Sequence, residues 1–351
     1  MTSIAKPKIL HEGIERNALK LTLRDYEGAL STLCAGCGHD SVTAAIVRAF
    51  FELDIPPHRA AKVSGIGCSS KTTAYFLGKS HGNNTVHGRM PSVMTGASSV
   101  NPDLYYIGVS GDGDSLSIGL GQFAHAIRRN INITYIVENN GVYGLTKGQF
   151  SASADLGTRT KTGELNEQAP IDPVKLALTL GASFVARSFS GDKKQLVPLI
   201  KAALKHRGFA LIDVLSPCVT FNDHEASTKS YAYAFGHYHP AVHADFIPPQ
   251  EEIHVDYDKG ELRPVRMHDG STVLLKKVDS DYDARDRGRV LDYLIAHEAK
   301  GEIVTGLLFI DEGKPDLHRM NKTVAAPLNA LPFEALCPGS DKLKALLDEF
   351  R

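Results

Sequence analysis

The middle of the chain alternates between two hydrophobic periods. Residues 105–110 (YYIGVS) form a short apolar, β-rich run that ends at the polar turn Gly-Asp-Gly, and residues 131–137 are again apolar and β-branched. The apolar residues between these runs recur at helical spacing: Leu116, Leu120, Phe123, Ala124 and Ile127. A strand, a helix and a second strand in this order predict one βαβ unit of a parallel sheet.

The same patterns predict further helices and strands on both sides of this unit. Helices are expected over about 40–53, 94–99, 173–180 and 193–206 and from Thr72, and strands at 60–63, 183–186 and 209–215. The succession predicts an α/β fold, a mainly parallel sheet with helices on both faces, in a domain that covers residues 31–222.

The two ends of the chain lack this regular alternation. Residues 1–30 are polar and mixed in charge, and we interpret them as an N-terminal arm. Residues 223–351 contain prolines, charged stretches and a group of histidines between 237 and 254 that we interpret as a surface or interface feature. We expect an irregular extension there, with a helix near 284–299, a strand at 303–310 and a C-terminal helix from about 341.

Composition excludes several classes of protein. The 351 residues carry a formal net charge of −1, and no dense Lys/Arg stripe suggests a nucleic-acid footprint. No signal-peptide-like segment opens the chain and no run of about 18 apolar residues occurs, so we expect a soluble, unexported, cytoplasmic protein. Five cysteines in such a chain favour metal or redox chemistry over structural disulfides.

Polar turns follow both strands of the central unit, where open α/β sheets bind ligands. Asp112 and Asn140 supply two hard oxygen donors, which suit Mg²⁺ held together with the phosphates of a ligand. Gly113 has no side chain, so backbone N–H groups at the start of the following helix can approach a phosphate. This pattern predicts a magnesium diphosphate site; an ordinary acidic turn followed by an Asn-rich turn is the alternative.

Four of the cysteines lie in turns. Cys34, Cys37 and Cys68 are flanked by glycines, and Cys218 follows a proline at the end of a predicted strand. Four thiolates can enclose a 4Fe–4S cluster or a tetrahedral Zn²⁺. One CxxC pair with two distant single cysteines is a poor pattern for a zinc ribbon, although spacing alone leaves a cluster, zinc and uncoordinated thiols open. Cys337 fits no part of this pattern.

These motifs resemble those of a known family. GDG, a helix and a closing NN form the fingerprint of thiamine diphosphate enzymes, and GDGDSLSIG…HAIRRNINITYIVENNGVYGLTKGQ is similar to the β subunits of 2-oxoacid:ferredoxin oxidoreductases. CAGCGH, GIGCSS and SPC resemble the segments where these subunits bind a 4Fe–4S cluster, which implies that Cys34, Cys37, Cys68 and Cys218 are its ligands.

The resemblance also implies roles for individual residues. Asp112, Asn140 and the carbonyl of Val142 would hold Mg²⁺, and Gly113 and Asp114 would lie against the diphosphate. The other positions implied to bind cofactors are Gly67, Ser69, Gly111, Gly144 and Thr146.

Three cations are candidates for contact with the substrate. The family comparison implies that Lys71 and Lys147 lie beside it, and Arg89, in the HGR segment with His87, could bind a carboxylate. Solvated lysines and an arginine that merely braces its loop are the alternatives.

The implied activity is CoA-dependent oxidative decarboxylation of a 2-oxoacid. Thiamine diphosphate makes the decarboxylated product electron-rich, and a nearby cluster passes its electrons to ferredoxin. The GDGD and GLTKGQ segments favour 2-oxoglutarate over pyruvate or another 2-oxoacid. An α subunit would supply the pyrimidine-binding half of the site, in an α2β2 heterotetramer. A thiamine-dependent decarboxylase or carboligase with a structural zinc site is the alternative.

Overall fold

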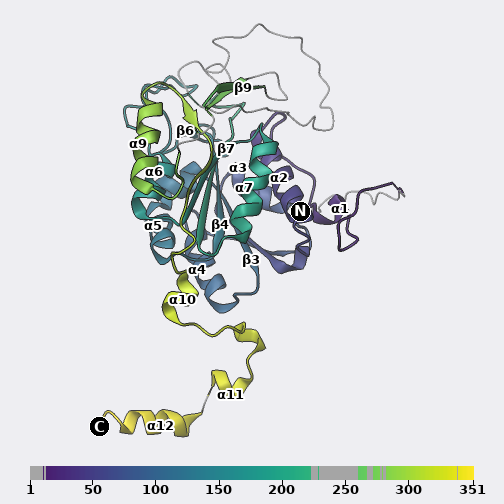
Figure 1. Cartoon of the computed structure of the whole chain (residues 1–351), viewed down its shortest axis with the longest axis vertical. Coiled ribbons are helices and arrows are strands. Elements are labelled where there is room, and N and C mark those ends of the chain that lie inside the picture. The colour runs from purple at the N-terminus through teal and green to yellow at the C-terminus, as the bar shows by residue number, and fades with distance from the viewer. Residues whose placement is uncertain are drawn as a thin grey trace.

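A seven-stranded, mainly parallel sheet forms the centre of the computed structural model (Figure 1), which describes residues 11, 13–222, 228, 260–266, 272–276, 279, 282–337 and 339–351. The strand order is β12-β7-β8-β4-β3-β1-β2, in which only β12 runs antiparallel to its neighbour. Its strands are β1 (Ala60–Ser64), β2 (His81–Asn84), β3 (Tyr105–Gly111), β4 (Ile133–Asn139), β7 (Phe184–Phe189), β8 (Phe209–Leu215) and β12 (Gly306–Ile310). The predicted fold class is therefore confirmed.

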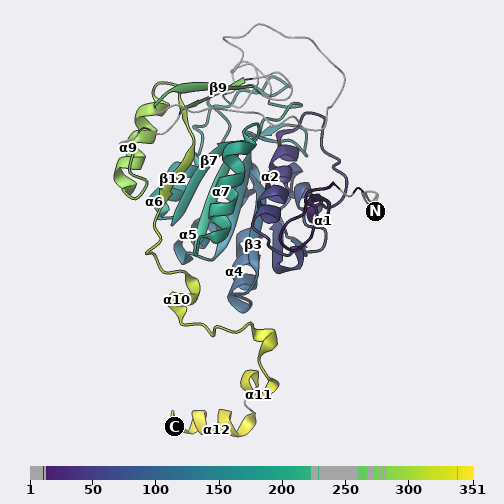
Figure 2. The same cartoon turned by 45° about the vertical axis from the view of Figure 1, so that its right-hand side comes forward.

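Helices cover both faces of this sheet. On one face lie α1 (Leu23–Tyr26), α2 (Gly38–Glu52) and α7 (Lys193–Lys205). On the other lie α4 (Met90–Val100), α5 (Leu120–Arg129), α6 (Pro173–Leu180) and α9 (Arg287–Glu298). Figure 2 shows α2 and α7 side by side, with α5, α6 and α9 on the other side of the sheet. Each layer buries its own apolar cluster, because each helix turns an apolar stripe towards the strands.

Several short elements complete the described part of the chain. The short helices are α3 (Cys68–Lys71), α10 (Leu317–Asn321), α11 (Phe333–Leu336), α12 (Ser340–Asp348), η1 (Pro57–Arg59), η2 (Thr72–Ala74) and η4 (Leu328–Ala330), together with the π-helical turn η3 (Gly113–Ile118). The remaining strands are β5 (Val142–Tyr143), β6 (Gln149–Phe150), β9 (Leu262–Arg266), β10 (Thr272–Lys276) and β11 (Ile303–Val304). No helix in the described residues is long and apolar enough to span a membrane.

Two expectations about the ends of the chain differ from the structure. Residues 13–30, expected to form an arm, pack against the body: Tyr26 is fully buried, and its hydroxyl accepts a hydrogen bond from Asn17 (2.7 Å). β12 lies beyond the expected boundary at residue 222, yet it pairs with β7 and completes the sheet. Both segments bury apolar surface that local periodicity does not reveal.

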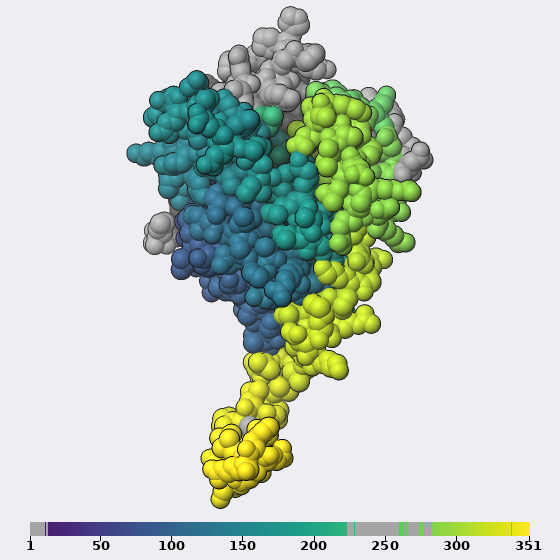
Figure 3. Space-filling view, turned by 90° about the vertical axis from the view of Figure 1, so that its left-hand side faces the viewer, coloured from purple at the N-terminus to yellow at the C-terminus, as the bar shows by residue number. Residues whose placement is uncertain are grey.

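The C-terminal segment agrees better with the irregular extension that the sequence predicts. From α10 onward the chain runs away from the body and ends in α12, which Figure 3 shows as a projecting tail. The histidines between 237 and 254 lie outside the described residues.

The central helix expected after the Gly-Asp-Gly turn is divided at Gly119 into η3 and α5. The short α3 and η2 replace the helix expected from Thr72.

Candidate functional site

The predicted site residues meet at the carboxyl edge of the parallel strands. The turn 67–69 follows β1, the turn 111–114 follows β3, and the loop 140–146 follows β4. Cys218 follows β8, and the turn 34–37 leads into α2 on the same side. Because parallel strands end at a common edge, segments far apart in sequence come together there.

Asp112 is held firmly at this edge. Its side chain is 1% exposed, and Oδ2 accepts hydrogen bonds from the backbone N–H of Gly141 (2.9 Å) and the hydroxyls of Ser151 and Ser153. Three donors therefore fix one carboxylate oxygen and orient the second, which leaves Oδ1 as the atom available to a cation.

Asn140 lies in the neighbouring turn and shares this hydrogen-bonded unit. Its Oδ1 accepts a bond from the N–H of Val142 (3.0 Å), and its carbonyl accepts one from Asn222 (2.8 Å). Gly141 has a φ of +75°, so the chain can turn back sharply and bring its N–H to Asp112. The two predicted oxygen donors thus lie on one rigid double turn.

A small cavity, here called the edge cavity, opens between these turns and has a volume of about 80 Å³. The predicted cofactor and metal positions that line it are Gly67, Cys68, Ser69, Gly111, Asp112, Gly113, Asp114, Asn140, Val142, Gly144 and Thr146. Only glycine fits at position 113, because a Cβ there would lie 2.5 Å from the ring of Tyr143. The missing side chain lets the ring of Tyr143 pack against the backbone of Gly113, which itself lines the cavity.

Asp114 has contacts that its sequence position does not reveal. Its carboxylate is 3% exposed and accepts hydrogen bonds from the N–H of Gly88 (2.7 Å), the N–H of Ile66 (3.3 Å) and the hydroxyl of Ser110. The Nδ1 atom of His87 lies against the same carboxylate. The side chain of Asp114 therefore joins three loops, and its backbone is the part that can face a diphosphate.

The four predicted cluster ligands converge beside the edge cavity. The N–H of Cys37 donates to the carbonyl of Cys34 (3.1 Å), which closes the CxxC turn. A Cβ added to Gly144 would lie 3.4 Å from the sulfur of Cys68 and 3.6 Å from that of Cys218. Gly144 thus lies beside two thiols that are 150 residues apart in sequence, and both Gly144 and Cys68 line the edge cavity.

Electrostatics disfavour thiolates in this group when no cation is present. Burial raises the pKa of the Cys37 thiol above its ordinary value. Burial and the neighbouring Cys218 also raise the pKa of Cys68, against a smaller opposing effect of the Lys71 ammonium. A positively charged group bound between the sulfurs would reverse this balance, because coordinated thiols lose their protons. Cys337 lies after α11 in the projecting tail.

A buried acid lies between the cysteines and the edge cavity, and sequence reasoning missed it. Glu138 is fully buried, and within the described residues neither carboxylate oxygen has a hydrogen-bond partner. Burial, with the negative charge of Asp40, raises its pKa well above the ordinary value. His39 lies 3.5 Å away, and burial lowers its pKa to about 4, so the imidazole brings no positive charge to Glu138 near pH 7. The sequence feature that could have revealed Glu138 is a single acidic residue within the mostly apolar run of β4.

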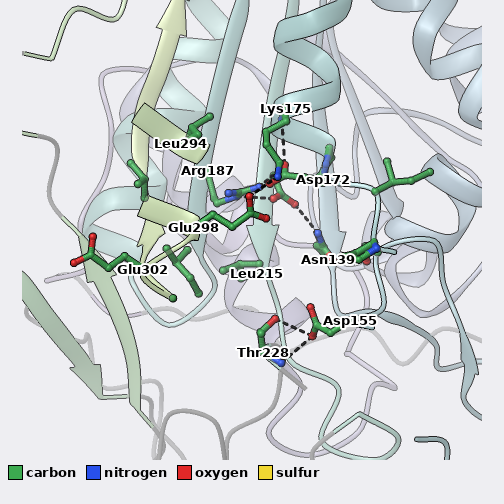
Figure 4. Close-up of a pocket in the computed structure, with 18 residues that line it drawn as sticks. Asn139, Asp155, Asp172, Lys175, Arg187, Leu215, Thr228, Leu294, Glu298 and Glu302 are labelled. Atoms are coloured by element: carbon green, nitrogen blue, oxygen red, sulfur yellow. Dashed lines mark hydrogen bonds and ion pairs between the residues drawn. The ribbon is translucent and has the colours of Figure 1, made fainter. Parts of the chain in front are cut away.

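A second cavity of about 190 Å³ adjoins the site on the far side of Asn139 (Figure 4). Asn139 accepts a hydrogen bond from Ser153 (2.9 Å) and donates one to Asp213 (3.0 Å). Arg187 contacts Asp213 (2.9 Å) and Asp172 (2.6 Å), and these carboxylates raise the pKa of Arg187 although burial opposes its charge. Ser153 therefore links the carboxylate expected to bind Mg²⁺ to a buried ion-pair network.

The three predicted substrate cations are arranged differently from the cofactor positions. Lys71, Lys147 and Arg89 are exposed and lie outside the residues that line the edge cavity. Lys147 has a φ of +79° in the loop that follows Gly144. The guanidinium of Arg89 donates to the side chain of Gln122 on α5 (2.9 Å), which braces the HGR loop.

The segments that form this site are similar to proteins of a known family. Residues 65–214 match the family model described as thiamine pyrophosphate enzyme, C-terminal TPP binding domain. A 2-oxoacid:ferredoxin oxidoreductase subunit beta of Saccharolobus solfataricus is 46% identical over 199 residues, which cover 56% of this chain and 65% of that subunit. The 2-oxoglutarate synthase subunit KorB of Methanocaldococcus jannaschii is 39% identical over 54% of this chain and 69% of its own length.

A solved structure extends the comparison over nearly the whole chain. It is described as 2-oxoglutarate:ferredoxin oxidoreductase from Magnetococcus marinus with 2-oxoglutarate, coenzyme A and succinyl-CoA bound. The match has a TM-score of 0.72 and 30% identity, and covers 96% of this chain and 98% of that one. The sequence match spans just under two thirds of the Saccharolobus subunit. Fold, motifs and relatives together show that this chain belongs to the β-subunit family of the 2-oxoacid:ferredoxin oxidoreductases.

Proposed function

We propose that this chain, together with an α subunit, catalyses the CoA-dependent oxidative decarboxylation of a 2-oxoacid and passes the electrons to ferredoxin. The preferred substrate is 2-oxoglutarate, with succinyl-CoA as the product. Support for this substrate comes from relatives named 2-oxoglutarate synthase or oxidoreductase subunits and from the Magnetococcus enzyme with 2-oxoglutarate and succinyl-CoA bound. Pyruvate or another 2-oxoacid is the substrate to test against it.

The observation that carries the proposal is the contact between two sites of different chemistry. Gly144 lines the edge cavity, and a Cβ added to it would be in van der Waals contact with the sulfurs of Cys68 and Cys218. Electrons released from a ligand in the cavity would therefore have a very short path to a cluster held by these thiols. A thiamine enzyme that only cleaves or forms carbon–carbon bonds has no use for such an arrangement.

The hard donors of the edge cavity fit a magnesium diphosphate. Asp112, Asn140 and the carbonyl of Val142 would hold Mg²⁺, because Mg²⁺ binds through few protein oxygens together with phosphates. Gly113 lines the edge cavity, where its backbone would face the phosphates. The thiamine diphosphate so held would supply a carbanion-stabilising ring; the chain's own part is to anchor and orient the diphosphate and keep it next to the thiols.

The thiols fit a four-iron cluster better than one zinc ion. Within the described residues, no three His, Cys, Asp or Glu side chains approach closely enough to enclose a single metal ion. Cluster ligands lie farther apart than the ligands of one ion, because the iron and sulfide atoms fill the space between them. Cys34, Cys37, Cys68 and Cys218 therefore form the proposed 4Fe–4S site.

An α partner is supported by exposed apolar residues around the edge cavity. Ile66, Val86, Ile118 and Leu145 are 38%, 75%, 44% and 45% exposed, and each belongs to a loop or turn beside the cavity. The cavity of about 80 Å³ is also far smaller than the roughly 300–1,000 Å³ of complete ligand pockets. A partner that brings the pyrimidine half of the site, in an α2β2 assembly, would cover these residues.

The exposed cations remain part of the proposal for the substrate. Lys71, Lys147 and Arg89 lie in the segments that surround the cavity, where a partner subunit would enclose them. A dicarboxylate such as 2-oxoglutarate would need a cation for its second carboxylate, which pyruvate lacks.

An activity assay of the purified αβ complex tests the proposal. With CoA and a viologen dye as acceptor, 2-oxoglutarate should support faster dye reduction than pyruvate or branched 2-oxoacids, and omission of CoA should abolish it. Substrate cleavage without dye reduction would instead support a decarboxylase. Absence of turnover with every 2-oxoacid, in a complex that contains thiamine diphosphate and iron, would contradict the proposed function.

A further inference from the structure

One histidine of the edge cavity has no role in the binding of magnesium, diphosphate or cluster. His87 lies in the loop before α4 and lines the cavity. Its Nδ1 atom lies against Oδ1 of Asp114, and its ring meets the ring of Tyr143 edge to face, with centroids 6.1 Å apart. The imidazole is therefore held from two sides.

The carboxylate behind this imidazole is fixed. Asp114 is 3% exposed and is bonded to the N–H of Gly88, the N–H of Ile66 and the hydroxyl of Ser110. Tyr143 is fixed as well, because its hydroxyl donates to the carbonyl of Gly113 (3.0 Å). A buried carboxylate with this many donors cannot rotate freely, so it defines the orientation of the ring that contacts it.

The two nitrogens of the imidazole differ, because Nδ1 is buried against Asp114. The Nδ1 atom of His87 is buried, whereas its side chain as a whole is 30% exposed. The exposed part of the side chain therefore excludes Nδ1, and the residue lines the edge cavity. Nδ1 is packed against Asp114 and has no hydrogen bond among the described residues, so Nε2 is the ring nitrogen left to exchange a proton with a ligand.

We propose that His87, oriented by Asp114, is the proton-transfer residue that this chain contributes to its active site. This inference rests on the proposed function, in which the oxo oxygen of a 2-oxoacid gains negative charge when its carbonyl carbon is attacked. The Nε2–H bond of protonated His87 breaks, its electron pair stays on nitrogen, and the proton forms an O–H bond with that oxygen. A water molecule that enters the edge cavity then returns a proton to Nε2.

The arrangement has the parts expected of an acid–base residue. A positioned histidine is the commonest group in such catalysis and contributes about 10²–10⁴-fold to the rate. A third group that orients the base is the usual companion, and here it is Asp114. Arg89, two residues later, is instead bonded to Gln122 and braces the same loop.

Removal and chemical rescue of the imidazole test the inference in the αβ complex. His87→Ala should lower the rate of 2-oxoacid-dependent dye reduction by about 100-fold or more. Free imidazole in the buffer should restore at least a tenth of the lost rate, because removal of the side chain leaves a space of the same shape in the wall of the edge cavity. His87→Gln should lower the rate of dye reduction to a similar extent. Imidazole should not restore it, because the glutamine side chain fills the space. His125→Ala, on the exposed face of α5, is the matched control and should keep the full rate.

Thiamine diphosphate affinity, measured by calorimetry, separates catalysis from structure. It should change by less than about threefold in His87→Ala, since the proposed magnesium ligands are untouched. A rate within threefold of the unmodified complex, an affinity loss as large as the rate loss, or no response to imidazole would each overturn the role of His87. Failure of the unmodified complex to turn over any 2-oxoacid would refute the proposed function instead.

Discussion

The proposed magnesium site and the cysteine group differ in how the fold makes them. The magnesium site comes from the ends of two neighbouring strands, β3 and β4, and its key carboxylate is fixed by three donors in the bare protein. The cysteines come from turns between residues 34 and 218, and burial raises the pKa values of Cys37 and Cys68. The fold therefore preforms the proposed magnesium site, whereas the cysteine group is completed only when it binds its metal.

This difference has a consequence for assembly. A preformed oxygen site loses little order on binding, so its affinity depends on single contacts. A thiol group with raised pKa values must release protons when metal binds, so its affinity depends on pH and on all ligands together. We therefore expect the two sites to respond independently, and differently, to substitution.

The largest expected effect is on the cluster. Cys218→Ser should reduce the iron content from about four per chain to nearly none, because a four-iron cluster needs all four thiolates. Thiamine diphosphate affinity should stay within about threefold, since the oxygen site does not use this residue. Iron analysis and the visible spectrum measure the first effect, and calorimetry the second. Cys337→Ser is the matched control and should keep its iron; an unchanged iron content in Cys218→Ser would remove this residue from the ligand set.

The converse substitution comes next in size. Asp112→Ala should weaken magnesium-dependent binding of thiamine diphosphate by at least about 100-fold, beyond the 10–100-fold typical of an outer partner. Turnover should disappear while the iron content and brown colour remain. Calorimetry in the presence of Mg²⁺ gives the affinity. Retained turnover would mean that the magnesium assignment is wrong.

A smaller effect is expected where the hydrogen-bond network supports the carboxylate. Ser153→Ala removes a donor to both Asp112 and Asn139, and should weaken magnesium-dependent binding of the cofactor by about 10–100-fold. Thr162→Ala, on an exposed position of the same loop, should change it less than twofold. Equal affinities of the two variants would show that the network does not orient Asp112.

The smallest effect concerns the buried acid between the two sites. Because the pKa of Glu138 is raised by folding, the folded state holds a proton that the unfolded state releases above its ordinary pKa. The contribution of Glu138 to the free energy of unfolding is therefore fully present below pH 4.5. It falls as the pH rises towards the raised pKa. Glu138→Gln should be more stable than the unmodified chain by about 1 kcal/mol at pH 7, and by less at pH 4.5.

Denaturant unfolding of the cofactor-free protein at both pH values measures this difference. The comparison between the two proteins cancels the opposite contribution of His39, which the unfolded state protonates more readily at acidic pH. A variant that is less stable than the unmodified chain at pH 7 would show that the carboxylate has partners in solution.

The sequence predicted the parts of the molecule that depend on local order. The strands β1, β3, β4 and β8 lie within two residues of their expected bounds, because apolar runs and turn residues define a buried parallel strand. The residues predicted to bind the cofactor and the metal lie together at one sheet edge, since polar turns directly follow those strands.

What the sequence did not reveal depends on contacts between distant segments. The hydrogen bond between Asn139 and Asp213 joins residues 74 apart, and no local pattern marks Ser153 as a partner of Asp112. The antiparallel edge strand β12 was expected as a strand, but its place in the main sheet was not. Asp114 was placed against the diphosphate by resemblance, whereas its carboxylate holds His87.

The central claim is that one chain holds a preformed magnesium diphosphate site next to a cluster held by four thiols. Analysis of iron, acid-labile sulfide and zinc in the anaerobically purified αβ complex tests it most directly. The account predicts about four iron and four sulfide per β chain, with zinc near zero. One zinc per chain with no sulfide would contradict it.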